Sequence, residues 1–154
     1  MKVLVTGNLG YVGNVLTRML LEQKIDVVGC DTGYYPQGFL DLFEPNITQI
    51  KKDIRNLSSE DLKGVSVICH LAALSNDPLG EINPNLTEEI NYNATIRLAK
   101  LAKEAKVEKF IFSSSCSSYG MNENTVNEES ELSPLTAYAK SKVNSEKEIS
   151  KLSD

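Results

Sequence analysis

The 154-residue sequence contains few of the residue types that mark several classes of protein. It has three cysteines, one histidine and no tryptophan, and no two cysteines stand at CxxC spacing. We therefore expect no disulfide framework and no metal site, but buried, reduced thiols in a cytoplasmic protein. No apolar run approaches the roughly 20 residues of a membrane span, and the first ten residues lack the apolar segment of a signal peptide.

The sequence also lacks an excess of positive charge. Its formal net charge is −5, which is the opposite of the basic surface that nucleic-acid binders and polybasic membrane anchors present. We therefore expect neither a nucleic acid nor a membrane as a partner. The hydrophobic content of 41% and the chain length are those of one globular domain, residues 1–154.

Apolar runs alternate with stretches of helical periodicity along the whole chain. Such runs predict strands at 2–6, 26–30, 47–51, 65–70 and 109–113. Helices are predicted at 11–24, at about 85–106, and from Ser133-Pro134 to about Leu152, with a short one before the fourth strand. Strands that are continuous apolar runs between helices predict an α/β fold, a doubly wound parallel sheet covered on both faces. The first helix should bury Val12, Val15, Leu16, Met19 and Leu20.

Three glycines follow the first predicted strand, within Thr6–Gly13 (TGNLGYVG). Glycines at a strand-to-helix junction permit a tight turn and let a pyrophosphate approach the backbone. The helix N-terminus adds unpaired N–H groups and the positive end of its dipole. This segment is therefore a candidate phosphate-binding loop, although the spacing is GxxGxxG and not GxGxxG.

Asp31 ends the second predicted strand, where an acid can accept hydrogen bonds from the ribose hydroxyls of adenosine. A structural alternative is an Asx turn in Asp31-Thr32-Gly33. The sequence between Asp31 and Lys51 contains no Lys or Arg, so we expect no basic residue near Asp31 that could neutralise a 2′-phosphate. The cofactor predicted on these grounds is NAD, in preference to NADP.

Tyr138 and Lys142 are four residues apart in the last predicted helix and so lie on one face. An ammonium group near a tyrosine hydroxyl stabilises the phenolate, so that Tyr138 can act as a general base. YxxxK is common on ordinary helix surfaces. The serines that end the fifth predicted strand, Ser113 to Ser115, favour the functional interpretation because a hydroxyl there can meet a substrate oxygen.

The ordered set of motifs resembles the N-terminal half of extended short-chain dehydrogenases/reductases, of the NAD-dependent nucleotide-sugar epimerase/dehydratase type. Besides the glycine loop, the matching segments are Asp53-Ile54-Arg55, His70–Ala73, Asn91 with Ala94-Thr95, Phe110–Gly120 (FIFSSSCSSYG), and Tyr138 with Lys142. The resemblance implies a Rossmann-type fold with Ser115, Tyr138 and Lys142 as catalytic residues. It implies cofactor contacts for Gly7, Gly10, Tyr11, Val12, Gly13, Asp31, Asp53, Ile54, Leu71, Ala72, Ala73, Asn91, Ser113, Tyr138 and Lys142.

The same resemblance implies a reaction. Tyr138 would take a proton from a sugar hydroxyl while the carbon gives hydride to NAD, and the transient keto-sugar would then be epimerised or dehydrated. Dehydratases of the family often carry an acid after the serine, whereas Cys116 and Ser117 follow Ser115, which favours an epimerase. Because the family is about twice as long, we expect either a fragment of a two-domain protein or a truncated gene product. We expect it to be inactive by itself and the full-length protein to be a homodimer. The alternative is a non-catalytic dinucleotide-binding sensor or scaffold.

Other residues receive structural interpretations. His70 is expected to be a polar residue at a strand end. Cys116 is expected to pack there, and the alternative is a reactive thiol beside the site. Tyr34, Tyr35 and Phe39 are expected to pack in their loop or to cover the adenine. The segment Ser75–Pro78 is either a substrate contact or a plain loop.

Overall fold

The computed structural model describes residues 1–34 and 46–152 of the chain. These residues form two compact units. The first comprises Met1–Ala73 and Arg97–Ser113, and the second comprises Leu74–Ile96 and Ser114–Asp154. Tyr35 and Phe39, for which a packing role is predicted, lie outside the described residues.

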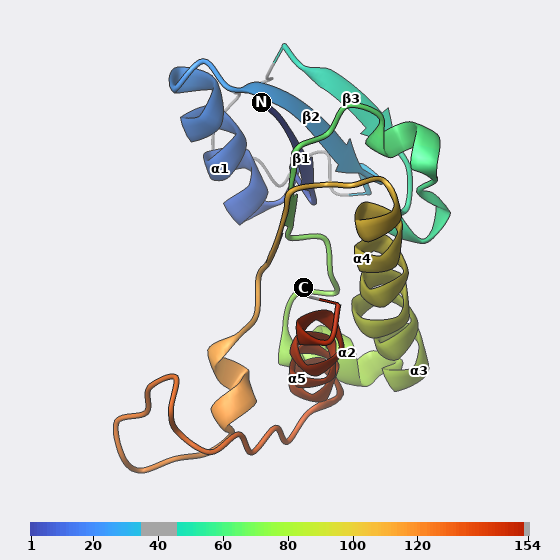
Figure 1. The fold of residues 1–154 in the computed structure, drawn as a ribbon. Helices are drawn as coiled ribbons and strands as arrows, with labels where there is room; N and C mark the ends of the chain where they lie inside the picture. The colour runs from blue at the N-terminus through green and yellow to red at the C-terminus, as the bar shows by residue number, and fades with distance from the viewer. Residues whose placement is uncertain (35–45, 153–154) are drawn as a thin grey trace. The chain divides into compact units, whose positions relative to one another are not determined.

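The first unit contains a parallel sheet whose strand order is β3-β2-β1-β4-β5 (Figure 1). The strands are β1 (Lys2–Thr6), β2 (Asp26–Asp31), β3 (Thr48–Lys51), β4 (Val67–His70) and β5 (Lys109–Phe112). The chain moves outward from β1 to β3 and then returns to the other side of β1, which is the reversal of a doubly wound sheet. The predicted fold class and all five predicted strands are therefore confirmed.

Successive side chains of a strand point to opposite faces of the sheet, and the central strands β1, β2 and β4 are buried on both faces, whereas β3 and β5 are partly exposed. On one face, Val3, Val5, Val27, Val67 and Cys69 form a cluster against which Leu16 and Leu20 of α1 (Tyr11–Glu22) pack. The alternate residues Leu4, Val28, Cys30 and Ile68 are also buried. In Figure 1, α1 lies on one side of the sheet and the part of α4 (Ala94–Glu104) from Arg97 onward lies on the other.

The predicted core face of α1 is partly wrong. Val12, Val15 and Met19 are half or more exposed, whereas Gly13 and Thr17 are buried. The close approach of Gly13 to the preceding loop turns the helix so that its small residues face inward. Apolar periodicity alone cannot distinguish this orientation of the helix from the predicted one, in which Val12, Val15 and Met19 face the sheet.

The second unit is built around α5 (Ala137–Ser150), which contacts α2 (Asp77–Ile82), α3 (Pro84–Glu88), the π-helical segment η3 (Glu89–Asn93) and the 3-10 helix η4 (Cys116–Tyr119). The predicted helix at 85–106 is confirmed as the run α3, η3 and α4. The last helix begins at Ala137 and not at Pro134, because Thr136 accepts the N–H of Ala139 at 3.0 Å and caps it. Helix α2 was not predicted.

The short helix predicted before β4 consists of two 3-10 turns, η1 (Ile54–Asn56) and η2 (Ser59–Leu62). Each is closed by its own acidic residue: Asp53 accepts the N–H of Arg55, and Asp61 accepts the N–H of Ser58. In the part of the chain that the structure describes, no helix is long and apolar enough to cross a bilayer.

Candidate active site

The glycine loop of the first unit is held close to β4. Gly7 has a φ of +74°, and a Cβ added to it would lie 2.8 Å from the nitrogen of Ala72. A Cβ on Gly13 would overlap the carbonyl oxygen of Gly7. Gly10 is less restricted, since its Cβ would lie 3.3 Å from that oxygen. Gly7 and Gly13 therefore allow close backbone approaches that no larger residue permits without a shift.

The N-terminus of α1 is open to a ligand. Among the described residues, no side chain caps this helix, whose N-cap is Gly10. The next two residues, Tyr11 and Val12, are exposed. Their N–H groups lie at the positive end of a twelve-residue helix, which is the arrangement that binds phosphate groups. The residues present thus fit the predicted pyrophosphate site.

Hydrogen bonds fix the two ends of the loop. Thr6 Oγ1 lies 2.6 Å from Nδ1 of His70, which is fully buried, and the N–H of Ala72 donates to the same Oγ1 at 3.4 Å. The side chain of Asn8 exchanges two hydrogen bonds with that of Gln49 on β3, at 2.8 and 3.1 Å. The structural interpretation of His70 is confirmed. The Asn8–Gln49 pair joins residues 41 positions apart and has no signal in the sequence.

Asp31 lies at the carboxyl end of β2 and already accepts two backbone hydrogen bonds. The N–H of Gly33 donates at 2.9 Å, so the Asx turn is present, and the N–H of Leu9 donates at 3.2 Å. Each carboxylate oxygen keeps acceptor capacity for a ribose hydroxyl, so the two interpretations are compatible. The expectation that no basic residue lies nearby is wrong, because Lys51 pairs with Asp31 in the sheet and its Cε would be 3.7 Å from a Cβ on Gly33.

Asp53, Ile54 and Ser113 complete the predicted cofactor residues that lie near strand ends of the first unit. Hydrogen bonds from Arg55, at 2.8 to 3.0 Å, keep the pKa of Asp53 below its usual value. Ile54 is buried and Ser113 is exposed. The N–H of Leu71 donates to the carbonyl of Thr6 at 3.1 Å, and that of Ser113 to the carbonyl of His70 at 3.2 Å. Leu71 and Ser113 are thus held in line with the sheet.

In the second unit, Tyr138 and Lys142 lie together on α5. Nζ of Lys142 is 5.8 Å from the centre of the Tyr138 ring, and both residues are buried, with exposed fractions of 4% and 8%. Burial lowers the pKa of Lys142 to about 8, and the carboxylate of Glu146 partly opposes this shift. At pH 7 the amine therefore remains mostly protonated, beside the tyrosine that it is predicted to activate.

Ser115 begins the turn of η4. It is the N-cap residue, and its Oγ accepts the N–H of Ser117 at 3.2 Å. The Ser118 hydroxyl donates to the carbonyl of Ser115 at 2.7 Å. Cys116 is exposed with a free thiol, so the expectation that it packs at a strand end is wrong, whereas Cys30 and Cys69 are buried as predicted.

Asn91 lies in η3 and is buried. Its side-chain oxygen accepts the N–H of Leu74 at 2.8 Å, and its amide donates to the carbonyl of Leu74 at 3.0 Å. Ser145 of α5 donates to the Asn91 carbonyl at 3.1 Å. Asn91 thus fastens Leu74 to the helices of the second unit.

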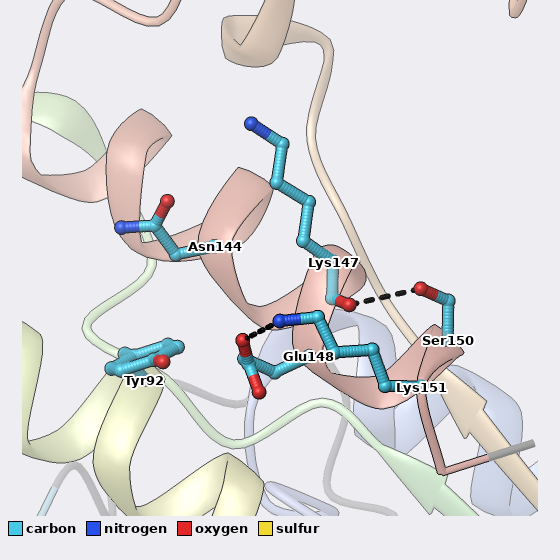
Figure 2. A pocket seen from close by; sticks show the side chains of 6 residues that line it. All are labelled: Tyr92, Asn144, Lys147, Glu148, Ser150 and Lys151. Atoms are coloured by element: carbon cyan, nitrogen blue, oxygen red, sulfur yellow. Dashed lines mark hydrogen bonds and ion pairs between the residues drawn. The ribbon is translucent and has the colours of Figure 1, made fainter.

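A cavity of about 350 Å³ in the second unit contains none of the predicted site residues. Figure 2 shows its lining, which consists of Tyr92, Asn144, Lys147, Glu148, Ser150 and Lys151. Lys151 pairs with Glu148 inside it, and the Ser150 hydroxyl donates to the carbonyl of Lys147 at 2.9 Å.

The side chain of Tyr34, in the first unit, is 74% exposed.

This chain is similar to known proteins over almost its whole length. The model of the NAD dependent epimerase/dehydratase family matches residues 3–154. An uncharacterized UDP-glucose epimerase of Bacillus subtilis is 34% identical over 96% of this chain and 50% of its own. The NAD dependent NDP-hexosamine 5,6-dehydratase TunA has a TM-score of 0.88 at 28% identity, covering 96% of this chain and 48% of its own. MoeE5 in complex with UDP-glucose and NAD has a TM-score of 0.87 at 29% identity, covering 97% and 48%. The chain spans about half the length of the curated relatives it matches.

Proposed function

Because the chain belongs to the NAD-dependent epimerase/dehydratase family, we propose that it supplies the cofactor-binding and catalytic residues of a nucleotide-sugar epimerase. The observation that carries this proposal is the buried pair of Tyr138 and Lys142 on α5. A non-catalytic dinucleotide-binding module would not require a lysine amine to be buried beside a tyrosine, since that burial is unfavourable for the charge.

The first unit holds NAD in this proposal. The open N-terminus of α1 and the loop from Gly7 to Gly13 bind the pyrophosphate. Asp31 accepts hydrogen bonds from the adenosine ribose, while Asp53 and Ile54 line the adenine side. Leu71, Ala72 and Ala73 follow β4, where the small side chains of the two alanines leave room beside the backbone. NAD, when bound, supplies the hydride acceptor.

The second unit performs the proton chemistry. Tyr138 accepts the proton of a sugar hydroxyl as the adjacent C–H bond breaks, which produces a keto-sugar. Lys142 stabilises the phenolate from one helical turn away and binds the nicotinamide ribose. Ser115 donates a hydrogen bond to the reacting oxygen, and its own oxygen is oriented by the N–H of Ser117. Proton transfer by a positioned side chain contributes about 10²–10⁴-fold to a rate.

Two observations favour epimerisation over dehydration. The residues after Ser115 are Cys116 and Ser117, so neither of the two positions that follow the serine carries an acid to assist the loss of water. A UDP-glucose 4-epimerase of Lactobacillus helveticus is 30% identical over 96% of this chain. The relatives are about twice as long as this chain, and we propose that the full-length protein has a second half that binds the nucleotide-sugar and that it forms a homodimer.

The test is turnover of a panel of UDP- and dTDP-hexoses by the full-length protein that contains residues 1–154, with products examined by mass spectrometry and chromatography. An epimerase yields a product of unchanged mass and altered retention. A product lighter by one water would replace epimerisation with dehydration. No turnover of any nucleotide-sugar, with NAD bound, would contradict the proposal.

A further inference from the structure

The carboxylate of Asp77 joins the two segments that carry Ser115 and Tyr138. Asp77 is the first residue of α2, and its Oδ2 accepts a hydrogen bond from Oγ of Ser117 at 2.9 Å. Its Oδ1 accepts a hydrogen bond from Oγ1 of Thr136. These partners are 40 and 59 positions away in the sequence, and all three residues belong to the second unit.

Each of the two hydroxyls belongs to a residue that orders a catalytic segment. The N–H of Ser117 donates to Oγ of Ser115 at 3.2 Å, so that Ser117 is part of the turn that presents the Ser115 hydroxyl. Thr136 is the N-cap of α5 and accepts the N–H of Ala139 at 3.0 Å. Tyr138 is two residues beyond this cap. Asp77 is therefore linked to the segments of Ser115 and Tyr138 through Ser117 and Thr136.

The rest of α2 supports the same arrangement. Asp77, Gly80 and Glu81 stand at i, i+3 and i+4, which places them on one helical face. Oε1 of Glu81 accepts the N–H of Ala137 at 2.6 Å, and a Cβ on Gly80 would lie 3.0 Å from Cβ of Tyr138. Two carboxylates thus lie at the positive end of α5, which stabilises this helix start.

We propose that Asp77 is a positioning residue that sets the separation and direction of the Ser115 and Tyr138 hydroxyls. This inference rests on the proposed function, because it assumes that both hydroxyls act on one sugar oxygen. The physical reason is that a misplacement of about 1 Å at a reacting group can cost about 100-fold in rate. A single carboxylate that accepts hydrogen bonds from both segments restricts the movement of one segment relative to the other.

The first test is steady-state turnover of Asp77→Ala, made in the full-length protein that contains residues 1–154. We expect kcat to fall by about 10- to 100-fold, with a much smaller change in KM. NAD affinity should stay as in the wild type, because the loop and Asp31 belong to the first unit. Asp77→Asn should recover most of kcat, since its amide can still bond both hydroxyls. A kcat of Asp77→Ala within twofold of the wild type would overturn the inference.

The second test separates positioning from a general loss of structure. If Asp77 acts through Ser115, then Ser115→Ala should lower kcat much less in the Asp77→Ala background than in the wild type. Glu81→Gln is the matched control, because Glu81 contacts the start of α5 but not the serine turn. The fold reductions in kcat caused by Glu81→Gln and by Ser115→Ala should multiply in the double variant. If the fold reductions caused by Asp77→Ala and by Ser115→Ala also multiplied, the inference would be overturned.

A third measurement does not depend on activity. In Asp77→Ala, amide hydrogen exchange should become faster at Ser117 and Ala139, whose N–H groups are bonded in the two joined segments. The milder Ser117→Ala should lower kcat without affecting the Ala139 amide, and unchanged exchange in Asp77→Ala would overturn the inference. If Ser115→Ala leaves wild-type turnover unchanged, the proposed function fails and the inference falls with it. If Ser115→Ala is damaging but Asp77→Ala is not, only the inference fails.

Discussion

The amine of Lys142 lies 5.8 Å from the centre of the Tyr138 ring, and both side chains are buried. The lysine is protonated in the unfolded chain up to its ordinary pKa of 10.5, whereas burial lowers its pKa to about 8 in the folded state. The unfolded state therefore binds more protons between these two values. The destabilisation from burying this charge is complete below about pH 8 and disappears as the pH rises toward 10.5.

Replacement of this amine by an apolar chain should stabilise the protein at neutral pH. We expect Lys142→Met to raise the free energy of unfolding at pH 7 by about 3 kcal/mol, and this gain should shrink between pH 8 and 10.5. Urea unfolding at several pH values measures it. Lys140→Met, on the exposed side of the same helix, is the control and should change little. A gain that is independent of pH would contradict the assignment.

The glycine loop should respond unequally to single methyl groups. Gly13→Ala forces the backbone at Gly7 to move, so we expect NAD affinity to fall at least about tenfold and stability to fall by about 1–3 kcal/mol. Gly10→Ala meets only one atom at 3.3 Å and should cost less than about 1 kcal/mol. Calorimetric titration with NAD and urea unfolding compare the two variants. Equal effects would mean that the observed close approaches do not matter.

Asp31 should determine the choice of cofactor. We expect NAD to bind in preference to NADP, and Asp31→Ala to weaken NAD by about 1–3 kcal/mol. Equal affinity of the wild type for NAD and NADP, measured by calorimetry, would refute this role.

Lys51 provides a second test of the role of Asp31, because the two residues pair between β2 and β3. In Asp31→Ala its amine is no longer opposed by a carboxylate, so NADP affinity should rise. Adding Lys51→Ala should reverse this rise while leaving NAD affinity almost unchanged.

Residues 1–154 by themselves should bind NAD but should not turn over a nucleotide-sugar. Positioning of a substrate accounts for about 7–11 kcal/mol of a barrier, and the proposed second half would supply it. Among the described strands β5 is an edge, and Ile111 on it is 54% exposed, so we expect self-association. Turnover assays and light scattering test both expectations, and measurable turnover or a stable monomer would contradict them.

Local sequence patterns were sufficient to predict the parallel sheet and the position of the glycine loop. The apolar runs of the strands and the segment Thr6–Gly13 are each contiguous in the sequence. They were not sufficient for the orientation of α1, where Gly13 and Thr17 face inward in place of Val12, Val15 and Met19. The start of α5 depends on a cap by Thr136, which the preceding Ser133-Pro134 pair obscured.

The long-range contacts of Asp77 and Lys51 could not be predicted from sequence patterns. Asp77 bonds Ser117 and Thr136 from 40 and 59 positions away, and nothing in Ser75–Pro78 distinguishes it from a plain loop acid. Lys51 is 20 positions from Asp31 in the chain, yet lies beside it because β2 and β3 pair in register. Such neighbours follow from topology and register, which must be known first.

The most direct test of the account compares the wild type with Tyr138→Phe in the full-length protein that contains residues 1–154. Both are supplied with NAD and with the nucleotide-sugar that the wild type turns over. We expect kcat to fall by about 10²–10⁴-fold, the contribution of a general base, while NAD affinity by calorimetry stays unchanged because the ring is kept. Activity within a few-fold of the wild type would show that Tyr138 is not the base and would contradict the account.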